Sequence, residues 1–256
     1  MQRTDGRAFD ELRPIRITTG YTEHAPGSVL IEFGKTRVLC TAMVEPKVPP
    51  FLIGRGTGWL TAEYAMLPSS TISRKRRENY KNGPDGRSTE ISRLIGRSLR
   101  CGIDLSHFGE RTLAIDCDVI QADGGTRTAS ITGGYVAMAV ALYKLRAAER
   151  CLKPPVAAIS CGVVDNELLL DLCYDEDSSA QADVNLVMAG EGFVEIQGTG
   201  EKRPVSREEL YRLLDMGELG IMELFEYQKK AIDEAVASII KQAPVVATLR
   251  HDGDDA

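Results

Sequence analysis

The chain has 256 residues, of which 43% are hydrophobic, so it can bury a sizeable core and is not a disordered protein. Its formal net charge of −6 argues against general affinity for nucleic acid, although a net figure hides local contrast. No apolar run approaches the ~20 residues that span a bilayer, and no apolar segment follows the charged N-terminus. We therefore expect a soluble, cytoplasmic protein without membrane contact.

The six cysteines include no Cys-x-x-Cys pair, and none of the three histidines lies at metal-ligand spacing from a cysteine or another histidine. We interpret the cysteines as reduced residues of the core and expect no zinc site. The general-base chemistry that histidine often performs must come from other groups or be unnecessary.

The first quarter of the chain is predicted to be sheet. Alternating and β-branched runs predict strands over 15–19, 28–33 and 36–44, and a further extended run over 59–64. Residues 46–58 between them are dense in proline and glycine, which indicates a loop.

A basic segment follows, from Arg74 to Arg87, with six basic residues against two acids. Its Asn-Gly-Pro-Asp-Gly run favours an exposed loop that is mobile around residues 79–86. From Ser88 onward, apolar residues at helical spacing predict a helix, which places Arg87 at the helix start.

The most informative stretch is the turn over residues 121–128, Gln-Ala-Asp-Gly-Gly-Thr-Arg-Thr, between a predicted strand (112–120) and a predicted helix (131–145). A glycine pair leaves N–H groups uncovered at the incoming helix, where an anion such as phosphate is favoured, and Arg127 adds a bidentate partner. The simpler alternative is an ordinary helix cap, because turns of this composition are common.

The second half is predicted as two hairpins and two helices. The strands are 156–164 and 168–172, joined at 165–166, and 184–189 and 193–197, joined at 190–191; the helices are 207–216 and 221–241. Alternating strands and helices of this kind predict an α+β fold, with helices packed on mixed and antiparallel sheets. A seam near 152–155 divides it into two halves of one compact domain.

An acidic loop over residues 175–183 lies between these hairpins, and its Asp177 and Asp183 can flank one cation. Carboxylate oxygens are the ligands that Mg²⁺ prefers, and a site with two of them leaves room for waters and substrate phosphates. The alternative is that these acids are only solvated. Beyond residue 241, the acidic tail 242–256 is expected to be disordered.

An anion pocket, a magnesium loop, an arginine-rich loop and no histidine cluster together favour phosphoryl or nucleotidyl transfer. Inorganic phosphate is already an anion at neutral pH, so as a nucleophile it needs no strong base. The site must instead hold two negative groups close together, which arginines, amides and a metal ion make possible. A kinase is less well supported, because there is no Gly-x-x-x-x-Gly-Lys-Ser/Thr loop.

Several motifs, in this order along roughly residues 1–240, resemble the bacterial ribonuclease PH family. They are Arg-Thr-Asp-Gly-Arg (3–7), Glu-Leu-Arg-Pro (11–14), Gly-Ser-Val-Leu (27–30), Gly-Trp-Leu-Thr-Ala-Glu-Tyr (58–64), Gln-Ala-Asp-Gly-Gly-Thr-Arg-Thr-Ala-Ser (121–130) and Glu-Asp-Ser (176–178) through Asp183. The resemblance implies an RNase PH-like domain over residues 1–241. It also implies a phosphate-dependent 3′→5′ exoribonuclease that trims tRNA precursors and other RNA 3′ ends, releases nucleoside diphosphates and runs backwards as a nucleotidyltransferase.

The resemblance also assigns residues. It implies a phosphate site at Arg87, Gly125, Thr126 and Arg127, and an acidic pair, catalytic and Mg²⁺-binding, at Asp177 and Asp183. It implies RNA contacts from Arg74 and Arg77. Ser69 stands where the family commonly has arginine, and we expect Lys75 and Arg76 to compensate for the missing positive charge. Members assemble as a hexameric ring of three dimers, which we expect here too. The alternative is an inactive, RNA-binding ring subunit of an exosome-like assembly. The presence of Asp177, Asp183, Arg87 and Arg127 makes this alternative less well supported.

Overall fold

A five-stranded mixed sheet forms the first half of the protein. The computed structural model describes residues 3–77 and 85–242. The strands of this sheet lie in the order β1-β2-β3-β5-β4, and only the β4–β5 pair is parallel. They are β1 (Ile15–Thr19), β2 (Gly27–Phe33), β3 (Thr36–Glu45), β4 (Trp59–Met66) and β5 (Thr112–Gln121).

A four-stranded antiparallel sheet forms the second half, in the order β7-β6-β8-β9. Its strands are β6 (Val156–Val164), β7 (Glu167–Leu170), β8 (Ala182–Ala189) and β9 (Gly192–Thr199). Two tight turns join the neighbouring strands β6 and β7, and β8 and β9. Asp165 and Asn166 adopt positive φ between β6 and β7, and Gly190 does so between β8 and β9.

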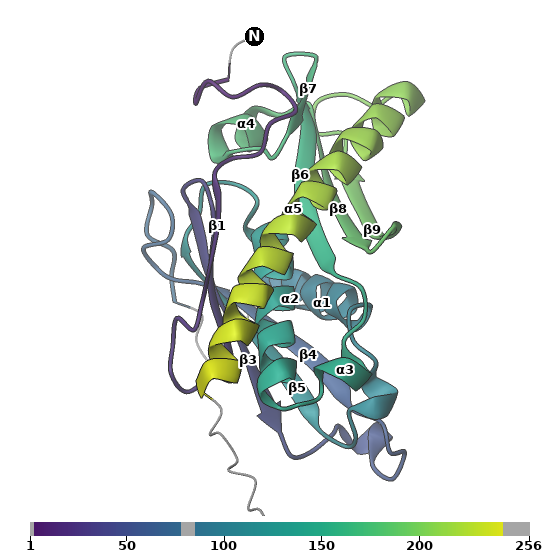
Figure 1. Cartoon of the computed structure of the whole chain (residues 1–256). Coiled ribbons are helices and arrows are strands. Elements are labelled where there is room, and N and C mark those ends of the chain that lie inside the picture. Colours follow the sequence, from purple (N-terminus) through teal and green to yellow (C-terminus); the bar gives the residue numbers. More distant parts are fainter. Residues whose placement is uncertain (1–2, 78–84, 243–256) are drawn as a thin grey trace, which may run out of the picture.

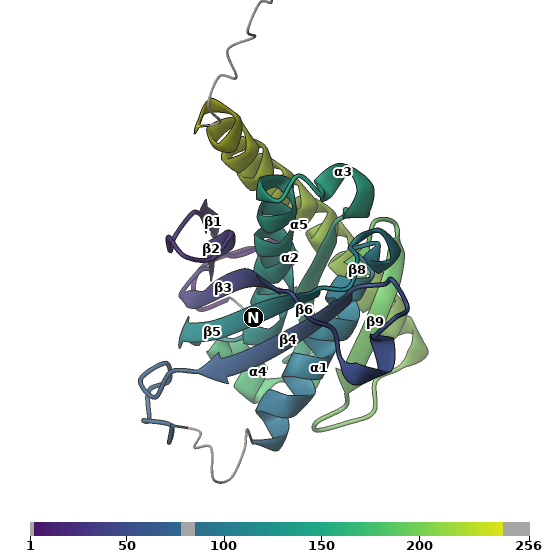
Figure 2. The ribbon, with the colours of Figure 1, turned by 90° about the horizontal axis from the view of Figure 1, so that it is seen from below.

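Helices join the two sheets. The central helix α2 contacts β2 and β3 of the first sheet and β6 of the second, and the long α5 crosses β6, β7 and β8 and reaches β1 (Figures 1 and 2). Helix α1 covers β4. The helical elements are η1 (Pro50–Leu52), α1 (Gly86–Arg100), η2 (Leu105–His107), α2 (Thr126–Lys144), α3 (Ala148–Cys151), α4 (Tyr174–Ser179) and α5 (Arg207–Gln242).

The hydrophobic core is shared by both halves. One cluster combines fully buried side chains of the first sheet, such as Ile31 and Ile115, with Ile159 and Leu186 of the second and Leu224 of α5. The expected α+β fold with mixed and antiparallel sheets is therefore confirmed. No helix within the described ranges combines the length and apolar character that crossing a membrane requires.

The prediction of two C-terminal helices is wrong, because Arg207–Gln242 forms one helix. Gly217 lies between the two predicted helices and allows close packing. A Cβ atom at Gly217 would collide with the Leu186 side chain and approach Cys161 Sγ to 3.2 Å. The absence of a side chain lets α5 lie directly on the second sheet, which outweighs the low helix propensity of glycine.

The prediction of an acidic loop over 175–183 is also wrong in part, because Tyr174–Ser179 forms the short helix α4. Its start is stabilised by Glu176, whose Oε2 accepts a hydrogen bond from the Cys173 backbone N–H at 3.0 Å.

Helix α2 begins at Thr126, five residues before the predicted start, so Thr126 and Arg127 lie in its first turn. Each predicted strand is observed, and its ends lie within two residues of the predicted ones. The tail beyond Gln242 and residues 79–84 of the predicted mobile loop lie outside the described residues.

Candidate active site

Five parts of the chain meet at a cavity of about 570 Å³. The first turns of α1 and α2 bring arginines, α4 and the start of β8 bring aspartates, and β9 with the following residues closes the remaining wall. The lining residues are Arg87, Glu90, Arg127, Asp177, Ser178, Ala180, Asp183, Asn185, Gln197, Thr199, Glu201 and Lys202. The two arginines and two aspartates predicted from the sequence thus share one cavity.

The basic wall comes from two helix N-termini. Arg87 is the second residue of α1, whose N-cap Asp85 accepts a hydrogen bond from Ser88 N at 2.6 Å. Its guanidinium is exposed and makes no hydrogen bond or ion pair with the described residues. Arg127, the second residue of α2, donates from Nη1 to Gln197 Oε1 at 2.7 Å. Two guanidinium groups beside two helix N-termini favour an anion with several oxygens.

The glycine pair before α2 adopts the conformation that the turn requires. Gly124 and Gly125 have φ angles of 75° and 66°, and Gly125 is the N-cap of α2. Thr126 is nearly buried and its hydroxyl lies 2.8 Å from the Tyr64 hydroxyl. Gly125 and Thr126 do not line the cavity, but they set the start of the helix that carries Arg127.

The acidic wall consists of Asp177 on α4 and Asp183 on β8. Burial raises the pKa of both carboxyl groups. The charge of Asp177 raises the pKa of Asp183 further, whereas Arg127 lowers the pKa of both groups and Arg87 that of Asp177. The two walls are therefore close enough to interact electrostatically.

The aspartate pair fits a hard divalent cation such as Mg²⁺. Oxygen donors are present, and the mutual repulsion of the two carboxylates would fall if a cation lay between them. Within residues 3–77 and 85–242, no group of three or more His, Cys, Asp or Glu residues is arranged to hold a metal ion. Waters and substrate phosphate oxygens would therefore have to complete the coordination shell.

The predicted RNA-binding residues lie outside the cavity, in the segment that leads from β4 toward α1. Arg74, Arg76 and Arg77 are exposed. Lys75 is partly buried, and its Nζ lies 3.5 Å from Asp85 Oδ2. Since Asp85 is the N-cap of α1, Lys75 connects this segment to the helix that presents Arg87.

Sequence reasoning missed several polar residues of the cavity. Asn185 lies two residues after Asp183 on β8, so both point to the same face, and its Nδ2 is 3.4 Å from Asp183 Oδ2. Gln197 and Thr199 of β9 pair with Asn185 and Asp183 in the β8–β9 ladder. The period of a strand could have identified Asn185. The register of the predicted hairpin could not have identified Gln197 and Thr199, because a β-bulge between Val187 and Met188 shifts the pairing by one residue.

A pocket that holds two carboxylates opposite two guanidinium groups is that of an enzyme acting on phosphate groups. Residues 11–143 match the 3′ exoribonuclease family, domain 1, and residues 154–219 match domain 2 of the same family. The predicted seam at 152–155 overlaps the start of the second match at residue 154.

Two relatives, both called Ribonuclease PH, are similar along almost their whole length. The one from Corynebacterium kroppenstedtii is 56% identical over 237 residues, which cover 91% of this chain and 93% of the relative. The one from Bacillus pumilus is 56% identical over 240 residues, 91% of this chain and 99% of the relative. The chain belongs to the 3′ exoribonuclease family.

Solved structures share the fold at lower identity. Rice (Oryza sativa) Rrp46 has a TM-score of 0.75 at 19% identity, covering 90% of this chain and all of that one. A chain of the Archaeoglobus fulgidus exosome, described as having RNA bound to the active site, has a TM-score of 0.74 at 21% identity and covers 88% of this chain and 92% of that one. At these identities the likeness establishes the fold alone.

Proposed function

We propose that this protein is a phosphorolytic 3′ exoribonuclease that trims tRNA precursors, with the cavity between α1, α2, α4 and β8 as its active centre. Family membership supports the reaction class. The observation that carries the proposal is that Arg87, Arg127 and the Asp177/Asp183 pair, which come from three separate parts of the sequence, line one cavity.

The reaction requires inorganic phosphate and the terminal phosphodiester of RNA side by side. An oxygen of hydrogen phosphate forms a bond to the terminal phosphorus, and the bond from that phosphorus to the 3′ oxygen of the preceding nucleotide breaks. The proton of the hydrogen phosphate ends on this leaving oxygen, so the products are a nucleoside diphosphate and RNA shortened by one residue. The reverse reaction adds a nucleotide.

Arg87, Arg127 and the first amides of α2 bind the attacking phosphate in this scheme, with Gly125 and Thr126 holding the helix start in place. Their positive charge offsets the repulsion between phosphate and RNA, and the rigid helix ends fix the approach. Asn185 and Gln197 orient Asp183 and Arg127, which they contact directly.

Asp177 and Asp183 are the residues that would hold Mg²⁺. Bound there, the ion would neutralise charge that develops on the phosphoryl oxygens of the terminal linkage. Asp177 and Asp183 are also the groups whose loss should affect the chemical step most, because they face the arginines across the cavity.

The exposed residues Arg74, Arg76 and Arg77, together with Lys75, contact RNA phosphates and position the strand without reading its sequence. Ser69 is exposed in the same segment and adds no charge. This division predicts that the segment determines RNA affinity, whereas the cavity determines turnover.

The catalytic unit spans residues 1–241 and assembles as a hexameric ring of three dimers in the cytoplasm. The shared core and the reach of α5 across both sheets support one unit rather than two. The ring and the cellular location rest on the likeness to ribonuclease PH. Native mass spectrometry, which measures the assembly mass directly, tests the ring.

The test of function is incubation with a tRNA that bears extra 3′ nucleotides, with Mg²⁺, in the presence and absence of inorganic phosphate. Nucleoside diphosphates released only with phosphate are the expected products. Nucleoside monophosphates would indicate hydrolysis, and RNA retained without products would indicate a binding subunit, so either result would overturn the proposal.

A further inference from the structure

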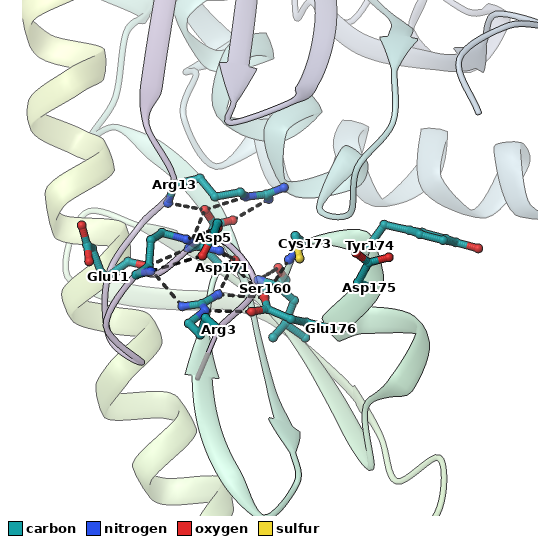
Figure 3. Close-up of polar contacts among 12 residues, drawn as sticks. Arg3, Asp5, Glu11, Arg13, Ser160, Asp171, Cys173, Tyr174, Asp175 and Glu176 are labelled. Carbon is teal, nitrogen blue, oxygen red and sulfur yellow. Dashed lines mark hydrogen bonds and ion pairs between the residues drawn. The ribbon is translucent and has the colours of Figure 1, made fainter. Parts of the chain in front are cut away.

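Two buried ion pairs, drawn in Figure 3, involve residues that do not line the cavity. Arg3 pairs with Glu176, and Arg13 pairs with Asp171. All four residues are at most 3% exposed. We call Arg3, Arg13, Asp171 and Glu176 the buried ionic network. Charged side chains are seldom buried so completely unless they are paired, so the role of the network requires an explanation.

The first pair holds helix α4. Arg3 donates from Nε to Glu176 Oε1 and from Nη2 to Glu176 Oε2, both at 2.8 Å, which is a bidentate arrangement. Arg3 Nη1 also donates to the Ala8 carbonyl at 3.0 Å. Glu176 directly precedes Asp177, and it also accepts the Cys173 N–H that begins the helix. The orientation of Asp177 in the cavity therefore depends on a bond to the N-terminal segment.

The second pair holds the turn over residues 121–128 before α2, which we call the phosphate turn. Arg13 donates from Nε and Nη2 to the two carboxylate oxygens of Asp171 at 3.0 and 2.7 Å. Its remaining nitrogen, Nη1, donates to the Asp123 carbonyl at 2.6 Å. Gly125 is packed so closely on this guanidinium that an added Cβ would lie 2.9 Å from Arg13 Nη2. The turn that starts α2, and hence Arg127, is thus fixed by Arg13.

The two pairs are joined to each other. Arg3 Nη2 donates to the Asp171 carbonyl at 3.1 Å, and the Asp171 residue itself has a positive φ of 52°. A non-glycine residue in this conformation is uncommon, and it persists only where the surroundings hold it. The network therefore forms one continuous connection from the turn before Arg127 to the helix that carries Asp177.

We infer that the buried ionic network positions the two walls of the active centre. The Arg13–Asp171 pair positions Arg127 in the basic wall, and the Arg3–Glu176 pair positions Asp177 in the acidic wall. These are positioning residues, since none of them lines the cavity. This inference rests on the proposed function and extends it. Net stability is a weak alternative explanation, because buried ion pairs often contribute no more stability than apolar residues of similar size.

The test compares two conservative variants, Arg13→Lys and Glu176→Gln, by steady-state phosphorolysis and by calorimetric titration with inorganic phosphate. Arg13→Lys should weaken phosphate binding roughly fivefold or more and raise the KM for phosphate in parallel, because the turn loses one hydrogen bond. Glu176→Gln should lower kcat about tenfold or more with a smaller change in phosphate affinity, because Asp177 is displaced. Rates are expressed per folded protein.

Leu142→Ala is the matched control, because Leu142 is fully buried at the opposite end of α2 and its truncation destabilises the fold without touching the network. This control should lower the unfolding midpoint but keep both kcat and phosphate affinity per folded protein. If Arg13→Lys and Glu176→Gln behave like this control, or both change the same parameter, the inference is wrong although the proposed function stands. If the unmodified enzyme releases no nucleoside diphosphates, the proposed function itself fails.

Discussion

The substitution Gly124→Ala should damage both stability and the active centre, since Gly124 combines a strained backbone with close packing. Its φ angle is 75°, and an added Cβ would lie 2.6 Å from the Leu172 carbonyl oxygen, 2.8 Å from Cys173 C and 3.0 Å from Tyr174 N. All three atoms are backbone, so they cannot move aside as a flexible side chain would. The segment they belong to leads into α4.

The expected cost has two parts. A left-handed conformation costs a non-glycine residue roughly 1–2 kcal/mol. Overpacking against well-packed atoms adds roughly 1–3 kcal/mol. Gly124→Ala should therefore lower the free energy of unfolding by roughly 2–5 kcal/mol, and the strain should separate the phosphate turn from α4, which lowers the rate of phosphorolysis of the folded protein.

Gly109→Ala is the matched control. Gly109 has a similar φ of 73°, but nothing lies within 4 Å of the added Cβ. This variant should show only the backbone cost, roughly 1–2 kcal/mol, with normal activity. Urea unfolding and phosphorolysis per folded protein measure both effects. Equal stability and equal activity in the two variants would refute the argument that the phosphate turn is packed against the start of α4.

Three further substitutions test other parts of the account. Asp183→Asn should abolish turnover but spare RNA binding, whereas Arg77→Ala should weaken RNA binding and reduce its salt slope by roughly one unit of charge. Product analysis measures turnover, and filter binding across salt concentrations measures RNA affinity. Loss of both properties in both variants would contradict the division of roles. Burial and the facing Glu63 carboxylate raise the pKa of Asp116, so its ionisation destabilises the fold at neutral pH. Asp116→Asn should therefore increase the urea midpoint at pH 7, with a gain that shrinks as the pH falls through that raised pKa; an unchanged midpoint across this range would refute the assignment.

Much of the fold could be predicted because local patterns and tertiary structure agree. The strand over 156–164 was predicted to the residue, since it is a continuous apolar run that ends at a turn of Asp165 and Asn166. The sheets, the α+β class and the 3′ exoribonuclease family are confirmed. A tight turn before α2 was also predicted, because glycine adopts positive φ readily and Gly124 and Gly125 follow a strand pattern directly.

The errors arose where distant residues determine local structure. Residues 174–179 contain three acids and two serines, a composition typical of loops, yet they form a helix because Glu176 is paired with Arg3. The predicted break between residues 216 and 221 is absent, and Gly217 in this interval instead packs against Leu186. Neither partner is recognisable from local sequence, so no periodicity argument could have found these contacts. The roles proposed for the arginines and aspartates of the cavity remain predictions.

The central claim is that one cavity brings inorganic phosphate and the terminal RNA linkage together. It is tested most directly by digesting a tRNA precursor with ³²P-labelled orthophosphate and locating the label in the products. The account predicts label in the β-phosphate of the released nucleoside diphosphates, and a higher phosphate requirement in Arg127→Ala. Unlabelled nucleoside monophosphates as the released products would contradict it.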